Sequence, residues 1–493
     1  MSNTRNLTAL AGLLFGTWVS AEEPLNVLFI IADDLNTRIG PYSGLEYHTP
    51  NLDRLAAEGV SFDRAYCQYP ICGPSRASLM SGLYPESNGI VGNSHVIGSF
   101  RAVTPGLSDH PSMAGLFREN GFFSARVSKI YHMGVPGGIE RGDPGGDDPD
   151  SWDYAYNVMG PETLSDGKLE LLSPKSLHYG GNFARMILPD HLDVTQTDYL
   201  ATSQAIAILE NRLRPIAEGA TNRVRRKPEA PFFLGVGMVR PHVPLIAPER
   251  NFRNIPESAT EVPVDQTDPK VPPAALRRKN EAIWGMDAEQ QRQTIEAYLA
   301  SVQFMDEQVG RLLDTLDRLG ARNNTVVIFL SDHGYNLGEH DCWSKQSLWE
   351  ESIRVPLILS APGYRKTAGT RSSAVVELID LYPTLAELCG LAGKVPERVQ
   401  GRSLVPMLKI PKACPADEQA YVVTHGAELG SLIGPRWKYN RWGPEAVNEA
   451  EELYDLEKDP GETRNLVHHP EYKNQLVRLR AAYDARRNLA NGR

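Results

Sequence analysis

The chain has 493 residues and the composition of an ordinary globular protein, with 41% hydrophobic and 23% charged residues. This length predicts one large domain and a smaller one, because single cores stop growing at roughly 250–300 residues. The formal net charge of −10 argues against non-specific binding to nucleic acid and means that an anionic ligand has to be attracted by local cations.

The first 21 residues predict a secretory signal peptide. Arg5 precedes an apolar run at residues 7–18, and Val19-Ser20-Ala21 has the small residues of a cleavage site. No later stretch reaches the roughly 20 apolar residues that a membrane helix needs. We therefore expect no membrane anchor and an exported mature chain, in a periplasmic or extracellular space or, in a eukaryote, in a lysosome-like compartment.

Four apolar runs predict buried strands, and each ends in polar residues. The runs are residues 25–31, 122–127, 231–237 and 325–330. Helical patterns lie between them at residues 49–59, 111–120, 199–212 and 292–319. This alternation predicts a doubly wound α/β domain around a mostly parallel sheet. Ligands of such sheets bind beyond the carboxyl ends of the strands, so the polar residues there should converge on one site.

Residues 409–493 predict a small C-terminal subdomain beside a large domain at residues 22–408. Short strands are indicated at 421–424, 437–439 and 452–456, and a helix at about 470–487. Together they predict a small antiparallel sheet with a helix. Two loops, residues 134–153 and 255–280, have no secondary-structure pattern of their own. Long loops inside a domain are usually functional or mobile, so they are either rims of a substrate pocket or plain surface insertions.

Two acidic pairs at strand ends predict a metal site. Asp33-Asp34 follows the first strand, and Asp332-His333 follows the fourth. A single Asp-Asp pair is more often a solvated turn, but two such pairs at converging strand ends favour a shared cation. Three carboxylates and one imidazole form a hard, oxygen-rich donor set that favours Ca²⁺ or Mg²⁺ over Zn²⁺.

Further cations and histidines accompany these strand ends. Lysines are usually solvated and histidines usually structural, so only their positions make them candidates. Arg76, Lys129 and Lys345 could hold an anion, while His132 and His242 suit proton transfer near neutral pH. The five cysteines are Cys67, Cys72, Cys342, Cys389 and Cys414. An exported protein could pair four of them, which would leave Cys72 free.

Cys72 begins the segment Cys72-Gly73-Pro74-Ser75-Arg76, which continues to Ser81-Gly82. A buried structural thiol is the ordinary alternative, since free cysteine behaves as a small hydrophobe. The segment resembles the signature of the type I sulfatases, C-x-P-S-R followed by T-G, with serine at position 81 in place of the usual threonine. In that family the cysteine is oxidised to formylglycine by a formylglycine-generating enzyme.

Other blocks extend the resemblance over most of the mature chain. Residues 121–132 resemble the second sulfatase motif, although an extra residue separates Lys129 from His132. Residues 240–244 and 331–340, together with 452–462, look like the iduronate-2-sulfatase branch of the family. The resemblance implies an alkaline-phosphatase-like α/β sandwich with a small C-terminal subdomain. It also implies hydrolysis of a sulfate ester in a sulfated carbohydrate, for which a 2-O-sulfate on a uronic acid or related sugar is expected.

The resemblance also implies the role of each site residue. Ca²⁺ would be bound by Asp33, Asp34, Asp332, His333 and the modified Cys72. Arg76 would stabilise the aldehyde hydrate, and Lys129 and Lys345 would hold the sulfate. Asp332 would accept a proton from the attacking hydroxyl. His242, with Lys345, would protonate the leaving alcohol, and His132 would assist the second half-reaction. A hydrate attacks sulfur with one hydroxyl and uses the other to expel sulfate.

Two other functions stay open at this point. The first is hydrolysis of phosphonate or phosphate esters on the same scaffold, because these cations and carboxylates do not separate phosphate from sulfate. The second is a non-catalytic relative that binds glycans. The sugar, the position of its sulfate and the oligomeric state do not follow from the sequence.

Overall fold

The computed structural model describes residues 24–43, 49–175, 182–213, 230–414, 418–443 and 450–492. The predicted signal peptide, residues 1–21, lies outside these ranges. Among the described residues, no helix combines the length and the apolar character needed to cross a bilayer. All five cysteines are described and none forms a disulfide, so the expectation that four of them could pair is wrong.

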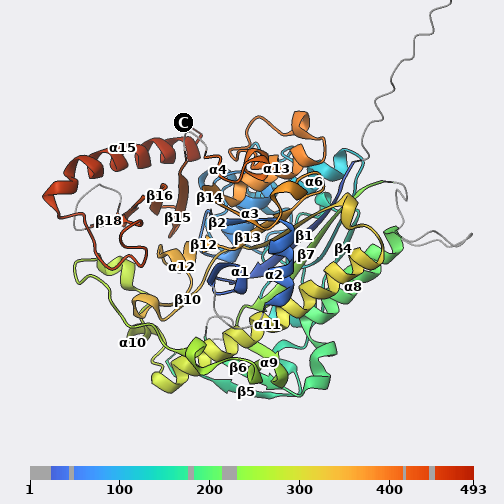
Figure 1. Cartoon of the computed structure of the whole chain (residues 1–493), viewed down its shortest axis with the longest axis horizontal. Coiled ribbons are helices and arrows are strands. Elements are labelled where there is room, and N and C mark those ends of the chain that lie inside the picture. Colours follow the sequence, from blue (N-terminus) through green and yellow to red (C-terminus); the bar gives the residue numbers. More distant parts are fainter. Residues whose placement is uncertain are drawn as a thin grey trace, which may run out of the picture.

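A nine-stranded sheet forms the centre of the molecule (Figure 1). Its middle strands are parallel and buried along their whole lengths. In spatial order they are β9 (Thr325–Ser331), β1 (Asn26–Asp33), β7 (Phe232–Pro241) and β3 (Phe123–Ser128). These are the four strands predicted from apolar runs, and the sheet is mostly parallel as expected.

The two edges of the sheet contain shorter or more polar strands that the apolar runs did not indicate. β4 (Tyr154–Tyr156) pairs with β3 on one edge. The other edge contains β13 (Leu357–Ser360), β2 (Val60–Tyr66), β12 (Arg354–Val355) and β14 (Thr370–Glu377). β13 is antiparallel to both β9 and β2, so the parallel order ends there.

Helices cover both faces of the sheet, and the side chains of β1 alternate between them. Val27, Phe29 and Ile31 belong to one hydrophobic core, which includes residues of α3 (Cys72–Ser81), α6 (Met113–Glu119) and α13 (Leu381–Leu388). Leu28 and Ile30 belong to the opposite core, which includes α2 (Pro50–Glu58), α8 (Thr197–Leu213) and α11 (Ala288–Arg318). The strand is therefore buried on both faces, as its uninterrupted apolar sequence requires.

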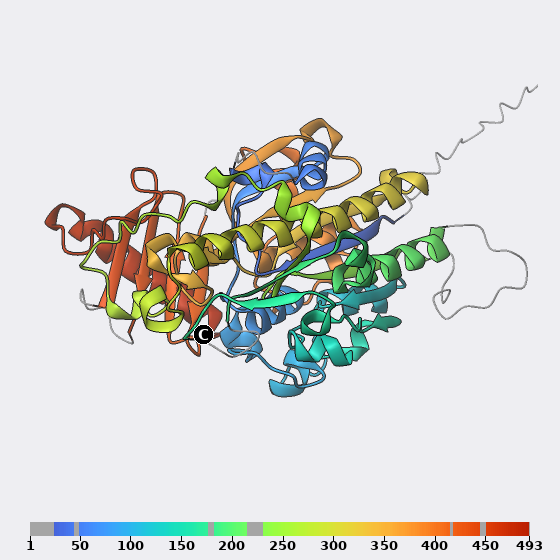
Figure 2. The ribbon, with the colours of Figure 1, turned by 90° about the horizontal axis from the view of Figure 1, so that it is seen from below.

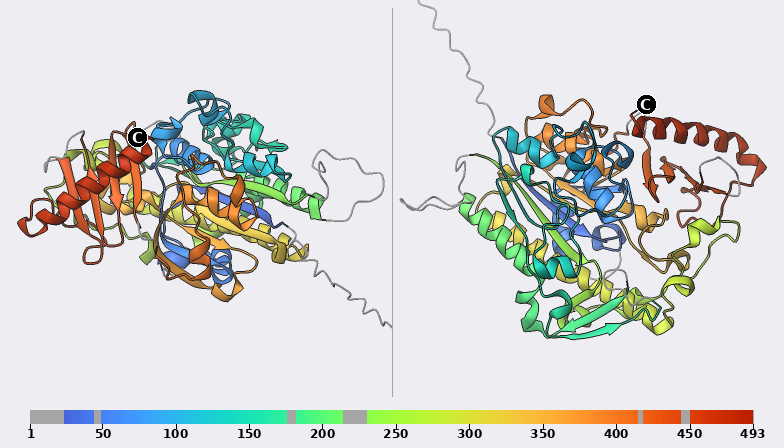
Figure 3. Two further views of the ribbon diagram at one scale, coloured as in Figure 1. Left: turned by 90° about the horizontal axis from the view of Figure 1, so that it is seen from above. Right: turned by 180° about the vertical axis from the view of Figure 1, so that it is seen from behind.

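A four-stranded antiparallel sheet lies at one end of the molecule (Figure 2). Its strands are β15 (Ala420–Thr424), β16 (Leu429–Ile433), β17 (Trp437–Arg441) and β18 (Glu451–Asp455). α15 (Lys473–Ala490) lies across one face of this sheet (Figure 3). The predicted antiparallel sheet and terminal helix are thus present, with β16 as an additional strand.

Smaller elements complete the fold. A three-stranded sheet contains β5 (Lys168–Leu171), β6 (Ala184–Leu188) and β8 (Leu245–Pro248), and β10 (Asn336–Leu337) pairs with β11 (Trp343–Ser344). Short helices are α1 (Gly40–Ser43), α4 (Pro85–Asn88), α5 (Ser99–Val103), α9 (Glu249–Arg253), α10 (Asn280–Ile283), α12 (Glu350–Ile353) and α14 (Val405–Lys409).

The two long loops contain more structure than their sequences indicate. α7 (Gly137–Arg141) and the 3₁₀ turn η1 (Pro149–Ser151) lie in residues 134–153. The turns η5 (Glu257–Thr260) and η6 (Pro273–Leu276) lie in residues 255–280. Each is a single short turn, too brief to leave a periodic hydrophobic pattern in the sequence.

Candidate active site

The carboxyl ends of two neighbouring strands bring the acidic pairs together. β1 and β9 are parallel with Ala32 opposite Ser331, so the residues that follow them emerge side by side. Asp34 has a φ of 66°, which turns the chain away from the strand direction. Its backbone N–H donates a 3.2 Å hydrogen bond to Asp332 Oδ1. The predicted convergence of the two pairs is confirmed.

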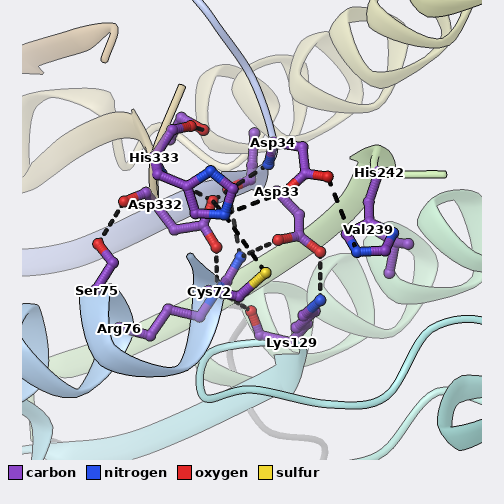
Figure 4. A network of polar contacts seen from close by, with 12 residues as sticks. Asp33, Asp34, Cys72, Ser75, Arg76, Lys129, Val239, His242, Asp332 and His333 are labelled. Carbon is purple, nitrogen blue, oxygen red and sulfur yellow. Dashed lines mark hydrogen bonds and ion pairs between the residues drawn. The ribbon is translucent and has the colours of Figure 1, made fainter. Parts of the chain in front are cut away.

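Cys72 lies at the centre of this group (Figure 4). It is the first residue of α3, and only 1% of its surface is exposed. Its Sγ is 3.5 Å from His333 Nε2 and 3.4 Å from Lys345 Nζ. The N–H of Gly73 donates to Asn93 Oδ1 at 2.9 Å, which ties the start of α3 to a loop that the sequence analysis did not connect with the site.

The side chain of Arg76 links several segments of the site through hydrogen bonds. Its side chain is fully buried, and its Nε donates to Asp332 Oδ2 at 2.7 Å. Its Nη1 donates to the carbonyl oxygens of Lys129 and Ile130. Among the described residues Arg76 has no hydrogen bond to Cys72 Sγ, so its contacts are those of a positioning residue.

Two lysines neutralise the acidic pair at the end of β1. Lys129 pairs with Asp33, and Lys345 Nζ lies 2.6 Å from Asp34 Oδ1. Both lysines are buried. Because each ammonium group has a buried carboxylate partner, the cost of removing both charges from water is partly offset.

Two histidines direct Nε2 into the site. His333 Nδ1 donates to Gly334 O at 2.8 Å, and His242 Nδ1 donates to Val243 O at 2.6 Å. These bonds orient each ring so that its Nε2 faces the carboxylates of the site. His333 Nε2 is 3.2 Å from Asp34 Oδ1, and His242 Nε2 is 3.9 Å from Asp34 Oδ2.

His132 occupies another side of the site. Burial lowers the pKa of its imidazole, and the side chain is close enough to Cys72 to lower the pKa of that thiol. Its ring centroid lies 5.0 Å from that of His95, a residue that the sequence analysis did not identify. His132 therefore lies in the site despite the extra residue that separates it from Lys129. The structure thus brings all the candidate residues together.

The crowded charges shift the acidities of these groups. Burial raises the pKa of the Cys72 thiol, but the ammonium groups of Lys345 and Lys129 outweigh it and hold the pKa well below its usual value. Burial raises the pKa of Asp332 to about 7, despite the nearby Arg76. Burial lowers the pKa of His333, but Asp332 and Cys72 oppose this and raise it to about 9.

The donor set fits a hard divalent cation. Ligand atoms of Asp33, Cys72, Asp332 and His333 all lie within 4.8 Å of one another. Asp33 Oδ1 and Asp34 Oδ2 are buried and accept no hydrogen bond from the described residues. Unsatisfied buried carboxylate oxygens are costly, and coordination would satisfy them. Oxygen-rich ligands of this kind suit Ca²⁺ or Mg²⁺.

Comparisons with known proteins identify the family. The Sulfatase family model matches residues 25–144 and 184–391, and the model "N-sulphoglucosamine sulphohydrolase, C-terminal" matches residues 338–488. This chain belongs to the sulfatase family. A sulfatase from Formosa agariphila is 31% identical, over 92% of this chain and 85% of the relative. Human iduronate 2-sulfatase is also 31% identical, over 77% of this chain and 71% of the relative.

Solved structures confirm the alkaline-phosphatase-like fold of this sulfatase. The phosphonate monoester hydrolase from Silicibacter pomeroyi aligns with a TM-score of 0.71 and 22% identity, over 95% of this chain and 96% of that one. This fold therefore does not by itself separate sulfate from phosphonate chemistry. The family match does, and the chain is an enzyme that hydrolyses sulfate esters.

Proposed function

We propose that this sulfatase removes a 2-O-sulfate from a uronic acid or a related sugar in a sulfated glycan, after export with residues 1–21 as signal peptide. The observation that carries the proposal is the position of Cys72. Its Sγ faces Lys345 and His333 at the carboxyl ends of β1 and β9, within the sulfatase signature. The resemblance to iduronate 2-sulfatase supports the choice of sugar.

Cys72 would be converted to formylglycine, whose hydrated aldehyde supplies the nucleophile. Asp33, Asp34, Asp332 and His333 would hold Ca²⁺ together with residue 72, and the cation would supply Lewis-acid polarisation of the sulfate. The two unsatisfied carboxylate oxygens support this assignment.

The chain's own side chains would do the remaining work. Lys129 and Lys345 would contact sulfate oxygens, since their ammonium groups pair with Asp33 and Asp34 at the site. Arg76 fixes Asp332, which would accept a proton from the attacking hydroxyl. His242, when it is also protonated at Nε2, would donate that proton to the leaving alcohol, and His132 would serve in the second half-reaction.

The first experiment is mass spectrometry of the peptide that contains Cys72, from protein made in its native host. We expect the mass to fall by the difference between a CH₂SH group and an aldehyde. The same preparation should hydrolyse a hexuronic acid 2-sulfate faster than the matched phosphate and phosphonate monoesters. Cys72→Ala is the inactive control.

Two outcomes would contradict the proposal. An unmodified thiol in a host that has the modifying enzyme would exclude formylglycine chemistry at this position. Equal or faster turnover of the phosphate or phosphonate ester would show that sulfate is not the preferred group. Retention of calcium on dialysis, measured by metal analysis against Asp33→Ala, tests the cation separately.

A further inference from the structure

Two neighbouring arginines lie beside the active site without a carboxylate partner. Arg277 and Arg278 follow η6, and both are partly buried. In the described part of the chain neither forms an ion pair. Arg277 Nε donates to Ala274 O at 3.2 Å, and Arg278 Nε donates to Lys345 O at 2.8 Å. Partial burial of two adjacent positive charges is unfavourable unless an anion compensates them.

A histidine from the C-terminal sheet completes the group. Arg277 Nη1 donates to His425 Nδ1 at 2.9 Å. Residues Arg277, Arg278 and His425 are called the basic cluster below. His425 follows β15, so the group joins the loop at residues 255–280 to the C-terminal sheet, which adjoins that loop in Figure 1.

The basic cluster is attached to both segments that carry the reacting groups. Arg278 binds the backbone of Lys345, whose Nζ lies 3.4 Å from Cys72 Sγ. On the other side, Gly426 next to His425 donates to the hydroxyl of Tyr69, three residues before Cys72. The cluster therefore adjoins the place where a sulfate ester would react.

Two hydrogen-bond donors of the basic cluster have no partner among the described residues. His425 Nδ1 accepts from Arg277, so its proton is on Nε2, and burial together with the two arginines lowers the pKa of His425 to about 4. The imidazole is thus neutral at physiological pH with an N–H at Nε2. Both His425 Nε2 and Arg277 Nη2 are buried, and neither has a hydrogen-bond partner among the described residues.

We propose that the basic cluster is an anion subsite that binds a second acidic group of the sulfated sugar, a carboxylate or a further sulfate, while the first sulfate reacts at residue 72. The inference rests on the proposed sugar sulfatase function and narrows the substrate to a sugar with at least two negative charges. Guanidinium groups suit this role because their planar donors match the oxygens of carboxylate and sulfate. In a chain with a net charge of −10, such local cations are needed to hold a polyanion.

Binding to the Cys72→Ala protein tests the subsite without turnover. Three sugars are titrated by calorimetry at about 0.15 M salt, where long-range attraction is screened: a hexose 2-sulfate, the corresponding hexuronic acid 2-sulfate and a hexose disulfate. We expect at least one of the two sugars with a second acidic group to bind ten-fold or more tightly than the monosulfate. The sugar with the greater gain identifies the carboxylate or the second sulfate as the preferred group.

Variants assign the preference to the cluster. When Arg277→Gln is combined with Cys72→Ala, the preference for the second acidic group should fall by ten-fold or more. Arg398 is exposed, and Arg398→Gln in the same background should leave this preference unchanged. His425→Gln provides an independent variant if Arg277→Gln does not fold, as judged by urea denaturation. Equal affinity for all three sugars, or a preference that survives in every folded cluster variant, would overturn the inference. Failure of the unmutated enzyme to hydrolyse any of the sugars would instead count against the proposed function.

Discussion

At the scale of single residues, His242 offers a chemical test of its proposed role. Its Nδ1 is fixed by Val243 O, and Nε2 faces Asp34 across 3.9 Å. General-acid catalysis contributes about 10²–10⁴-fold to rate, and it matters most when the leaving group is a basic alcohol. We therefore expect His242→Ala to lower kcat for a sugar sulfate by that factor and to affect p-nitrophenyl sulfate much less.

Steady-state kinetics with both substrates checks this prediction. The exposed His468→Ala variant is the matched control and should change neither rate. An equal loss on the two esters would indicate that His242 positions the substrate or the carboxylates and does not protonate the leaving group.

The sequence could predict the central site residues because their positions in the fold are simple. Asp33 and Asp332 each follow an uninterrupted apolar strand, and parallel strands end at one edge of the sheet. Arg277 and His425 could not be found in that way. One follows a short turn in a long loop and the other follows a strand of the C-terminal sheet, so only tertiary packing brings them to each other and to Lys345.

At the scale of elements, α11 has a well-defined beginning. Asp287 accepts a hydrogen bond from Gln290 N, and the Gln290 side chain accepts one from Asp287 N. Asp287→Ala removes the acceptor, so we expect the free energy of unfolding to fall by about 0.5–2 kcal/mol. Urea denaturation measures the change, while kcat should stay at its original value because Asp287 is exposed and its hydrogen bonds in the cap are with Gln290 and not with the site residues.

Asp287→Asn is the control for this cap, since asparagine also accepts the backbone hydrogen bond. Its stability should stay close to that of the unmutated protein. A loss in Asp287→Asn as large as that in Asp287→Ala would show that the charge near the helix N-terminus, and not the hydrogen bond, stabilises α11.

The elements that the sequence did not reveal have a common physical property. β14 begins with Thr370-Arg371-Ser372-Ser373, and the middle of β2 contains Asp63 and Arg64. Both strands lie outside the parallel centre of the sheet and have some side chains that are not fully buried, so they lack the uninterrupted apolar run of a central strand. β1 and β9 are buried on both faces, so their uninterrupted apolar runs made them predictable from the sequence.

At the scale of the whole molecule, a buried charge cluster joins the C-terminal sheet to the large sheet region. Lys438 of β17 lies 3.2 Å from Glu350 Oε1 and 2.6 Å from Glu462 Oε1. Burial raises the pKa of the nearby Glu351 to about 7 and that of Glu462 to about 8. Their ordinary value is 4.5, so at these two carboxyl groups the folded protein binds more protons than the unfolded chain between these values.

The contribution of Glu351 and Glu462 to stability should therefore decrease as pH rises through this window. With more protons bound in the folded state, the free energy of unfolding falls with pH, by at most about 1.4 kcal/mol per pH unit for each proton. Urea denaturation between pH 4.5 and 8 measures this slope. Glu351→Gln removes one of the titrating groups and should make the slope less steep, whereas an unchanged slope would show that Glu351 does not titrate there.

The burial of Cys72 determines whether its proposed modification could occur before or after the chain folds. A side chain that is 1% exposed at the start of a packed helix cannot enter the catalytic pocket of another enzyme. The proposed conversion of Cys72 to an aldehyde would therefore have to precede folding, so modification and folding would compete in time. We expect rapid folding at high expression levels to produce correctly folded molecules that are permanently inactive, so the active fraction of a preparation would reflect how that competition ended and not how stable the protein is.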